Sequence, residues 1–383
     1  MIPRLGEDLL VCFAQACAIA AMAGLALMSL NIVALLRRPR SWPKALPADP
    51  VTVLVPLCGA EDGLFARLAA LCRQAYGGPV QLVFGASSAS DPAIRVVSRL
   101  VREFPAARID LVVDPRSHGC NRKVSNLVNM LERARHDTLV FVDSDIVVPP
   151  GYLTRIVSEL AREGAGAVTC LYYGVAGAGR WAAMSSMSIN FHFLPDAVLG
   201  VWLRLAEPCF GATIAISRQL LERVGGLAAF GDCLYDDHAI GAAVRQTGQR
   251  VAISSVVVGH VCLERSSREL LDTQLRRART IRMINPIGYA GSLVTYPSVL
   301  ALIALLLGNL QGLPILAAAL ALRLVECASI ERAFQLPRHR YLDVLARDVL
   351  AFGVYLTAFF GDEVVWRGSR YRTSRRGTLL ADS

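Results

Sequence analysis

The feature that most constrains the fold is an apolar stretch near the N-terminus. From Leu9 to Leu36 the sequence is almost uninterrupted by polar residues, and the exceptions are Gln15, Ser29 and Asn31. About 20 apolar residues suffice to cross the hydrocarbon core of a bilayer, so this stretch can span it with some tilt. The sequence therefore predicts a protein that is anchored in a membrane.

The residues that flank this stretch predict its orientation. A cleaved signal peptide would have a shorter apolar region followed by a small-residue cleavage site, whereas Arg37, Arg38 and Arg40 follow here at once. We therefore expect an uncleaved anchor. These arginines and Lys44 outweigh Arg4 on the N-terminal side, so the positive-inside rule places the chain after residue 36 in the cytoplasm.

The composition agrees with a membrane protein and argues against a nucleic-acid partner. Of the 383 residues, 54% are hydrophobic and 19% are charged, whereas soluble proteins carry about 25% charged residues. The net charge is +9, but 38 of the 40 basic residues are arginines, which indicates a GC-rich bacterial codon bias. A nucleic-acid surface would also need clustered charge with interleaved aromatic residues. The ten cysteines form no CxxC pair, so we expect small buried hydrophobes in a reducing compartment.

Two further apolar regions lie in the C-terminal part of the chain. The first runs from about Leu293 to Leu324 and is broken by turn-forming residues at 308–314, so it is either one long tilted span or a hairpin of two short ones. The second runs from Val349 to Val365 and ends at Trp366, an interfacial residue type. The single span and the hairpin at 293–324 would place the arginines of the C-terminal tail on opposite sides of the membrane. Shallow monotopic insertion is a third alternative.

Between Pro47 and about Asn285, short β-branched runs alternate with helical patterns. The expected strands cover 51–55, 80–84, 109–113 and 138–142, and the expected helices cover 64–76, 92–104 and 123–135. This alternation is typical of βαβ units in a mostly parallel sheet, which binds ligands at the carboxyl ends of its strands. We therefore expect an N-terminal anchor and basic linker over 1–46, an α/β domain over 47–290, and C-terminal membrane helices with a basic tail over 291–383.

Carboxylates follow two of the predicted strands. Glu61 and Asp62 come soon after the first, and Asp143 and Asp145 directly follow the strand at 138–142. Carboxylates next to a buried strand are costly unless a positive group meets them, and Mg²⁺ and Mn²⁺ prefer oxygen ligands. The Asp-Ser-Asp sequence therefore indicates a metal–diphosphate site, although the same residues are equally typical of a turn with a helix cap.

Several motifs occur in the order found in one enzyme family. They are SDPAI at 90–94, DSD at 143–145, LYDDH at 234–238 and QLRR at 274–277. They resemble the three-aspartate and (Q/R)xxRW series of processive and lipid-directed inverting glycosyltransferases. The sequence around these motifs, over roughly 50–290, resembles the ceramide glucosyltransferase family most closely. The segments that carry this resemblance are NRKVSNL, FVDSDI, CFGATIAISRQLLERVGG and QLRRARTIR. The arrangement of membrane segments is also similar to that of the family. The resemblance implies a GT-A-like (Rossmann-like) α/β domain with N-terminal and C-terminal transmembrane helices.

Within this family the chain also resembles the hopanoid-biosynthesis-associated glycosyltransferases, which attach a sugar to the polyol tail of bacteriohopanetetrol. One position departs from the family pattern, because Ala278 stands where the family has tryptophan. An indole offers a large stacking surface, so the packing of the acceptor there is in doubt.

The resemblance implies an inverting, metal-dependent transfer from a UDP-sugar to a lipid hydroxyl, with Mg²⁺ or Mn²⁺ as cofactor. N-acetylglucosamine is the donor sugar that the hopanoid branch implies, and the residues do not distinguish it from glucose. Bacteriohopanetetrol is the expected acceptor and ceramide the alternative, at the bacterial inner membrane. A polysaccharide synthase would need more spans and the missing tryptophan, and a transporter or scaffold would carry charges inside its spans.

The resemblance assigns donor-side roles to four residues. Asp91, Lys123 and Asp143 are expected to bind the donor, and Asp145 to hold the metal. Asp91 precedes a proline at a predicted helix start, so without the resemblance an N-cap is the more common interpretation. A lysine in an arginine-rich chain suits a phosphate or uracil contact. His260, after the strand at 256–258, is a candidate to complete the metal shell, although such a histidine is usually structural.

The acceptor side is expected to contain the general base. Asp237 resembles the third aspartate of the series and Asp236 is the fallback, since adjacent carboxylates raise each other's pKa when their carboxyl groups are close. His192 and Cys209 are expected to bind the acceptor. A half-buried structural histidine is an equal alternative for His192, and no local motif activates Cys209 as a nucleophile.

The helical pattern at 270–282 places Gln274 and Arg277 on one face. We expect them to bind the donor, where they would meet the departing diphosphate, or alternatively the acceptor. The other interpretation is a basic amphipathic helix that lies on anionic lipid.

Overall fold

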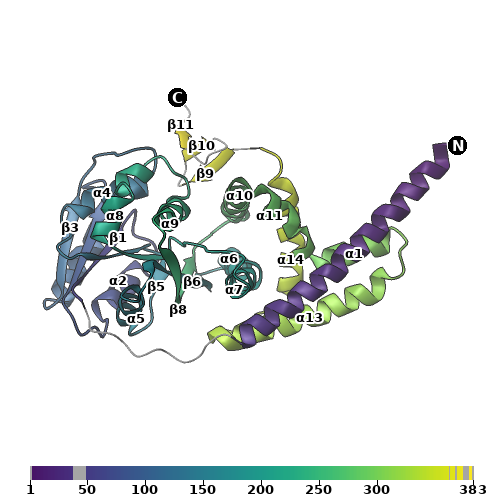
Figure 1. Ribbon diagram of the computed structural model, residues 1–383, viewed down its shortest axis with the longest axis horizontal. Helices are drawn as coiled ribbons and strands as arrows, with labels where there is room; N and C mark the ends of the chain where they lie inside the picture. Colours follow the sequence, from purple (N-terminus) through teal and green to yellow (C-terminus); the bar gives the residue numbers. More distant parts are fainter. Residues whose placement is uncertain (1, 38–48, 362, 367–368, 374–378, 382–383) are drawn as a thin grey trace. The chain divides into compact units, whose positions relative to one another are not determined.

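The computed structural model describes residues 2–37, 49–361, 363–366, 369–373 and 379–381. The predictions that depend on Arg38, Arg40, Lys44, Arg367, Arg375 and Arg376 lie outside the described residues. Contacts divide the chain into two compact units (Figure 1). The sheet unit comprises Pro39–Ala182, Glu207–Leu263 and Arg370–Ser383, and the helical unit comprises Met1–Arg38, Ala183–Ala206 and Glu264–Ser369.

Within the described residues the sheet unit is built on an eight-stranded sheet with the order β3-β2-β1-β4-β7-β6-β8-β5. The strands are β1 Val51–Pro56, β2 Val80–Ala86, β3 Arg108–Val113, β4 Thr138–Val142, β5 Ile146–Val147, β6 Ala165–Ala176, β7 Thr213–Ser217 and β8 Arg250–Cys262. Strands β3, β2, β1 and β4 are parallel, as are β6 and β8, so the predicted mostly parallel sheet is confirmed. Strand β7 runs antiparallel to β4 and β6, and β5 antiparallel to β8, which makes the sheet mixed.

Helices cover both faces of this sheet (Figure 1). Their bounds are α2 Leu64–Cys72, α3 Ala93–Glu103, α4 Arg122–Leu131, α5 Tyr152–Leu160, α8 Arg218–Arg223 and α9 Asp236–Gln246. Successive side chains of a strand point to opposite faces. Val53 of β1 accordingly packs in a core with α2, α3 and α5, whereas Leu54 packs with α4, α8 and α9. Burial on both faces explains why β1 is apolar throughout its length.

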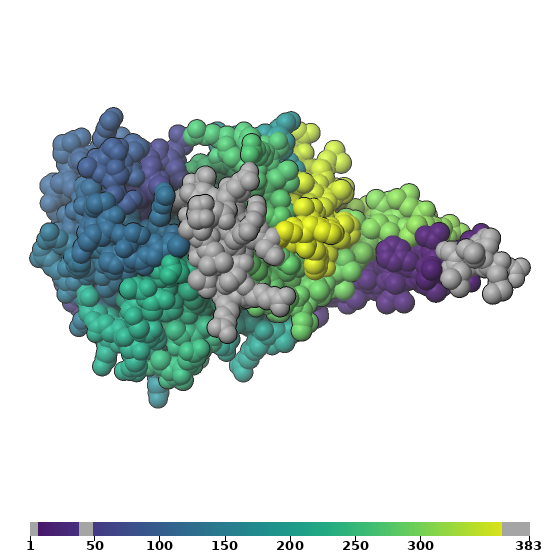
Figure 2. Space-filling model, turned by 90° about the horizontal axis from the view of Figure 1, so that it is seen from above, coloured from purple at the N-terminus to yellow at the C-terminus, as the bar shows by residue number. Residues whose placement is uncertain are grey.

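The helical unit contains the apolar helices. Its main elements are α1 Ile2–Leu36, the π-helical turn η1 Ile189–Phe193, α7 Leu194–Trp202, α10 Ser267–Ile284, α11 Pro286–Gly291, η3 Ser292–Thr295, α12 Pro297–Leu306, α13 Gly312–Phe334 and α14 Tyr341–Thr357. Helix α1 contacts α12 and α13, and Figure 2 shows the purple residues of α1 beside the light green residues of α13. Small residues at the contact, Ala18, Ala21, Ala301 and Ala304, let the backbones approach closely.

Two helices among the described residues are long and apolar enough to cross a membrane, namely Glu7–Leu36 within α1 and Gly312–Phe334. A third candidate arises if Pro286–Thr295 and Pro297–Leu306, which are bent by 67°, form one broken span or a re-entrant loop. The predicted region 293–324 is therefore a pair of helices with a turn between them, in which Gly308 adopts a φ of 88°.

The last predicted apolar region differs from the expectation. Helix α14 ends at Thr357 and is followed by the short strands β9 Glu363–Trp366, β10 Ser369–Thr373 and β11 Leu379–Ala381. Helix α14 has 17 residues and includes Arg347 and Asp348, so it is too short and too polar to be a candidate span. The chain passes between the units within α6 Arg180–Ser188, and residues 183–206 and 264–290 group with the apolar helices rather than with the sheet.

Candidate active site

The N-terminus of α4 places Lys123 in a group of carboxylates. Asn121 caps this helix, because its side chain accepts hydrogen bonds from the amides of Lys123 and Val124. The Nζ of Lys123 lies 2.8 Å from Oδ1 of Asp143, which directly follows β4, and 3.5 Å from Oδ2 of Asp236 at the start of α9. The structure thus brings together three residues that the sequence singled out separately.

Asp236 and Asp237 occupy the first turn of α9 but have different partners. The Oδ1 of Asp236 accepts a hydrogen bond from Nδ2 of Asn121 at 3.2 Å, and its Oδ2 faces Lys123. Asp237 is held by backbone amides, since Gly211 N donates to its Oδ2 and His238 N to its Oδ1, both at 2.8 Å. One aspartate therefore has a cationic partner, and the other has neutral ones.

Gly211 lies at the centre of this arrangement. A Cβ atom at this position would lie 3.1 Å from Nζ of Lys123, 3.3 Å from Oδ2 of Asp237 and 3.4 Å from Oδ2 of Asp143. The ammonium of Lys123 and the carboxylates of Asp237 and Asp143 therefore all lie close to the side of Gly211 where a side chain would be. We call Lys123, Asp143, Asp236, Asp237 and Gly211 the carboxylate–lysine cluster.

Electrostatics in the cluster favour a basic carboxylate. Burial, followed by the charge of Asp236, raises the pKa of Asp237 to about 6, although Lys123 and the two amides oppose this shift. Burial also raises the pKa of Asp143 in spite of Lys123. Burial lowers the pKa of Lys123, but Asp143 and Asp236 raise it further, so its net shift is upward. Lys123 is therefore a permanent cation.

Asp145 lies next to a histidine from another strand. Its Oδ1 is 3.5 Å from Nδ1 of His260, which is in β8. Strands β5 and β8 pair so that Ile146 is opposite His260. Within the described part of the chain, no group of three or more His, Cys, Asp or Glu side chains is arranged to hold a metal ion. The protein thus supplies a pair of ligand-type side chains here.

Asp91 connects the ends of β1 and β2 to α3. Both of its carboxylate oxygens lie 3.1 Å from the amide of Gly59, in the loop after β1, and Oδ1 accepts a second hydrogen bond from the amide of Ala93 at 2.8 Å. The bond to Ala93 is of the capping type expected from the sequence. The bond to Gly59 fixes a loop at the carboxyl ends of the strands.

Cys209 belongs to the core of the sheet unit. Its side chain is 5% exposed and packs against Gly241 of α9, where an added Cβ would lie 2.5 Å from that of Cys209. Burial raises the pKa of its thiol. The expectation that Cys209 is no nucleophile agrees with this environment, and its acceptor-binding role stays a prediction.

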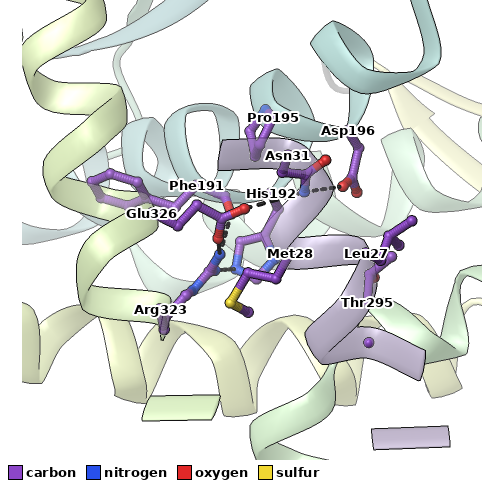
Figure 3. A pocket seen from close by; sticks show the side chains of 11 residues that line it. Leu27, Met28, Asn31, Phe191, His192, Pro195, Asp196, Thr295, Arg323 and Glu326 are labelled. Carbon is purple, nitrogen blue, oxygen red and sulfur yellow. Dashed lines mark hydrogen bonds and ion pairs between the residues drawn. The ribbon is translucent and has the colours of Figure 1, made fainter. Parts of the chain in front are cut away.

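His192 lies in the helical unit, in η1, and lines a pocket there (Figure 3). Its Nε2 is 3.1 Å from Nη2 of Arg323 in α13 and 3.0 Å from Oδ1 of Asp348 in α14. Isolated π-helical turns frequently occur at functional sites. Arg323 and Asp348 were not recognised from the sequence, in which Arg323 stands near the end of an apolar run.

The same pocket contains an amide and two further carboxylates. Nδ2 of Asn31, in α1, lies 3.1 Å from Oε1 of Glu326 and 3.3 Å from Oδ1 of Asp196. Leu27 and Met28 of α1 add apolar surface (Figure 3). A signal for this network was present in the sequence, because Arg323 and Glu326 are spaced i, i+3 in a helix that carries no charge before residue 323.

Helix α10 holds Gln274 and Arg277, as expected. Oε1 of Gln274 accepts hydrogen bonds from Oγ of Ser188 and Nη2 of Arg347, both at 2.8 Å. Two other arginines of α10 have a structural role, since Arg279 donates to the carbonyl of Phe360 and Arg282 to that of Gly361. These carbonyls follow the C-terminus of α14, where cations are favourable.

Comparisons with known proteins agree with this fold. The chain is 25% identical over 218 residues to ceramide glucosyltransferase 1 of Caenorhabditis elegans, covering 57% of this chain and 46% of that protein. It is 24% identical over 228 residues to ceramide glucosyltransferase 3 of the same organism, covering 59% and 48%. The chain thus matches about half the length of these relatives.

A solved structure supports the fold of most of the chain. The mannosyltransferase PcManGT from Pyrobaculum calidifontis, in complex with GDP-Man and Mn²⁺, matches with a TM-score of 0.53 and 22% identity, covering 92% of this chain and 99% of that one. The family model described as glycosyl transferase family 21 matches residues 15–379. Because this match includes both the sheet unit and the apolar helices, the chain belongs to glycosyl transferase family 21.

Proposed function

We propose that this protein transfers a sugar from a UDP-sugar to a hydroxyl group of a membrane lipid, with inversion at the sugar carbon in one displacement. The observation that carries the proposal is the carboxylate–lysine cluster at the ends of the strands. There Asp237 is held by two amides and has a pKa raised to about 6, which is suited to accepting a proton near neutral pH.

Asp237 is the general base in this proposal, and Asp236 positions its neighbours. Both oxygens of Asp236 are engaged, Oδ1 by the amide of Asn121 and Oδ2 by the ammonium of Lys123, so its carboxylate holds these two side chains in place. Asp237 has amide partners, so each of its oxygens retains a lone pair for the acceptor hydroxyl. The proton of that hydroxyl passes to Asp237 as the hydroxyl oxygen attacks the sugar carbon, and the bond from that carbon to the diphosphate oxygen breaks, so that UDP leaves.

The donor would be held by Asp91, Lys123 and Asp143. A UDP-sugar carries a diphosphate, and an ammonium at the N-terminus of α4 favours negative charge there. Charge develops on this diphosphate as the sugar leaves, so a fixed cation stabilises the transition state more than the ground state. Gln274 and Arg277 are proposed as further donor-binding residues.

A divalent ion fits Asp145 and His260 in part. A carboxylate and an imidazole are ligand types that Mn²⁺ accepts, and Mg²⁺ usually has one or two carboxylates and completes its shell with phosphate oxygens and water. The pair at 3.5 Å suits such a partly protein-bound ion. When bound, Mg²⁺ or Mn²⁺ would neutralise charge on the leaving diphosphate.

The acceptor is proposed to be a hopanoid polyol, bacteriohopanetetrol, with His192 and Cys209 as binding residues. The curated relatives are ceramide glucosyltransferases, which makes ceramide the second candidate. N-acetylglucosamine is the preferred sugar, with glucose as the alternative. The two candidate spans support a place in the bacterial inner membrane, with a catalytic domain over 47–290 on the cytoplasmic side.

Activity of the purified full-length protein tests this proposal. UDP-glucose and UDP-N-acetylglucosamine would be offered separately, each against bacteriohopanetetrol and ceramide, with Mg²⁺, Mn²⁺ or EDTA. We expect a glycosylated lipid that requires the metal ion, that disappears in Asp237→Asn and that persists at a reduced level in Asp236→Asn. Folded protein that transfers no sugar to either lipid would refute the proposal, and the reverse order of the two variants would make Asp236 the base.

A further inference from the structure

Arg67 of α2 is a buried arginine that the proposed reaction does not use. Its side chain is 5% exposed. Its Nε donates to the carbonyl of Ser144 and its Nη1 to the carbonyl of Asp62, both at 2.8 Å. Its Nη2 lies 3.4 Å from Oε2 of Glu61. One guanidinium therefore connects α2 with the loop after β1 and with the turn after β4.

The turn at 143–146 contains Asp145, the proposed metal ligand. The two peptide groups that flank the Cα atom of Asp145 are both held from outside the turn. The carbonyl of Ser144 accepts the hydrogen bond from Arg67, and the carbonyl of Asp145 accepts one from the amide of Val261 in β8 at 2.9 Å. Peptide groups are planar, so fixing both of them fixes the φ and ψ angles of Asp145 and the direction of its Cα–Cβ bond. Arg67 thus acts on this carboxylate through the backbone.

The contacts of Arg67 indicate that it acts through its position more than through charge balance. Its contact with Glu61 is long, and the side chain of Glu61 is 39% exposed, so this ion pair contributes little to stability. The two short hydrogen bonds go to backbone carbonyls. Burial lowers the pKa of Arg67, but an arginine stays protonated in proteins. A buried cation is costly unless its donors are satisfied, and here the carbonyls of two loops satisfy them.

We infer that Arg67 is a positioning residue for Asp145, and that by holding the carbonyl of Ser144 it keeps the turn at 143–146 in the conformation that binds a divalent cation together with the diphosphate of the donor. The inference rests on the proposed function in taking Asp145 as the metal ligand. A turn that is already ordered loses no further freedom when the ion binds, which lowers the free-energy cost of binding. Groups that orient a metal ligand typically contribute about 10- to 100-fold to metal affinity.

The charge of Arg67 would have the opposite effect on a metal ion. Asp145 stabilises this charge, and a cation so placed also repels a divalent ion bound to Asp145. Removal of the charge alone should therefore strengthen metal binding, whereas removal of the hydrogen bond to Ser144 should weaken it. Because position and charge predict changes of opposite sign, variants that separate them can decide between the two.

Three substitutions separate the hydrogen bond from the charge. The side-chain nitrogen of glutamine stands as many bonds from Cα as Nε of arginine, so Arg67→Gln can keep the bond to Ser144 without the charge. Lysine has a methylene group at that place and its ammonium one bond further on, so Arg67→Lys keeps the charge and loses the Nε bond. Arg67→Met loses both and keeps an apolar side chain of similar length.

The first readout is the affinity for Mn²⁺ in the presence of UDP, measured from the EPR signal of the free ion with full-length protein in phosphatidylcholine nanodiscs. We expect about 10- to 100-fold weaker binding in Arg67→Met, and the weakest in Arg67→Lys, which also keeps the repelling charge. Arg67→Gln should bind Mn²⁺ at least as tightly as the wild type. No sugar transfer is needed for this measurement.

Arg218→Met is the matched control. Arg218 of α8 also donates to a backbone carbonyl, that of Ala134 at 2.8 Å, but Ala134 precedes the start of β4 whereas Ser144 follows its end. The substitution removes the same kind of bond from the other end of the strand. We expect the Mn²⁺ affinity of Arg218→Met to equal that of the wild type, even if its thermal midpoint falls.

The second readout is hydrogen–deuterium exchange, which reports on the turn without any ligand. The amide of Ile146 donates to the carbonyl of Asp143 at 3.2 Å and closes the turn, and the amide of Val261 donates to Asp145. Both amides should exchange faster in Arg67→Lys and Arg67→Met than in the wild type, because the turn then opens more often. In Arg67→Gln and Arg218→Met their exchange should stay at the wild-type rate.

Two results would overturn the inference, namely equal Mn²⁺ affinity in the wild type and Arg67→Lys, or tighter binding in Arg67→Met than in the wild type. The second result would make charge the dominant effect. If Arg67→Met does not fold, the comparison of Arg67→Gln with Arg67→Lys decides the matter. Wild-type protein that binds no Mn²⁺ in the presence of UDP would refute the metal site of the proposed function as well, whereas Mn²⁺ binding that is indifferent to residue 67 would refute the inference alone.

Discussion

In the sheet unit the carboxylates of Asp143, Asp236 and Asp237 surround the ammonium of Lys123, whereas in the helical unit the guanidinium of Arg323 has an acceptor for each of its donors. The first cluster has more negative than positive charge and is partly open to solvent. The second is buried, with Arg323 only 5% exposed.

The difference shows how the same residue types serve different purposes. Excess negative charge and burial raise the pKa of Asp237, and such perturbed groups are typical of catalytic sites. In the helical unit the matched donors and acceptors lower the pKa of Asp348 instead, because Arg323 outweighs the effect of burial, and so the carboxylate stays ionised. A cluster with excess negative charge keeps a carboxylate available for chemistry. A cluster in which every donor of the cation has an acceptor holds helices together.

The largest effect is expected for Asp237→Asn. Loss of a general base lowers kcat by about 10²- to 10⁴-fold. The thermal midpoint should not fall, because a carboxylate whose pKa is raised by the folded state is unfavourable there when it is ionised. Steady-state kinetics and a thermal unfolding scan of the same preparation check both parts. A variant that loses its stability together with its activity would break the comparison, since Asp237 would then stabilise the fold as the partners of Arg323 do.

Arg323→Met is expected to show the opposite pattern. Removing one partner of a buried ion pair leaves Asp348 and Glu326 as uncompensated charges, which costs about 3–5 kcal/mol. Thermal unfolding should begin at a markedly lower temperature in the variant, and Arg323→Lys should recover part of the loss. An unchanged unfolding temperature in Arg323→Met would show that the network contributes little to stability.

The pH dependence of kcat/KM sharpens the assignment of the base. Asp237 must be ionised to accept a proton, so activity should be lost as the pH falls through about 6. Lys123 lowers the pKa of Asp237, so in Lys123→Met the midpoint should move to higher pH. A midpoint that stays in place, or moves to lower pH, would mean that another group controls the profile.

The sequence predicted the sheet unit better than the helical unit. Alternating apolar strands and helices identify a parallel sheet, and Asp143 at the end of β4 was located because strand ends gather ligands. The antiparallel insertion of β7 was not predicted, because the residue pattern of TIAIS at 213–217 does not show in which direction the strand runs. The partners of Asp237 also escaped prediction, since a backbone amide such as that of Gly211 leaves no signal in the residue type.

The helical unit shows why polar residues in apolar runs are difficult to interpret. Asn31 was noted merely as an interruption of the first apolar stretch, and Arg323, which lies near the end of another, was not singled out. Their partners come from segments far apart in the chain, since Asn31 and Glu326 are separated by 295 positions. Long-range pairs of this kind cannot be inferred from the spacing in one sequence.

The smallest effect is expected for Gly211→Ala, which tests how closely the cluster is packed. Gly211 does not adopt a positive φ, so alanine adds no backbone strain there, and its Cβ meets the flexible end of Lys123 at 3.1 Å. We expect kcat to fall severalfold, and because the flexible end of Lys123 can move aside, the loss of stability should be about 1 kcal/mol, the low end of the range for an added methyl group. Gly24→Ala in α1 is the matched control, because its Cβ would lie 2.9 Å from Cβ of Pro297 and closer still to the carbonyl of Val294, neither of which is the end of a flexible side chain. That variant should lose stability and keep its sugar-donor affinity, and if Gly211→Ala behaved in the same way, the crowding at Gly211 would be structural rather than part of the site.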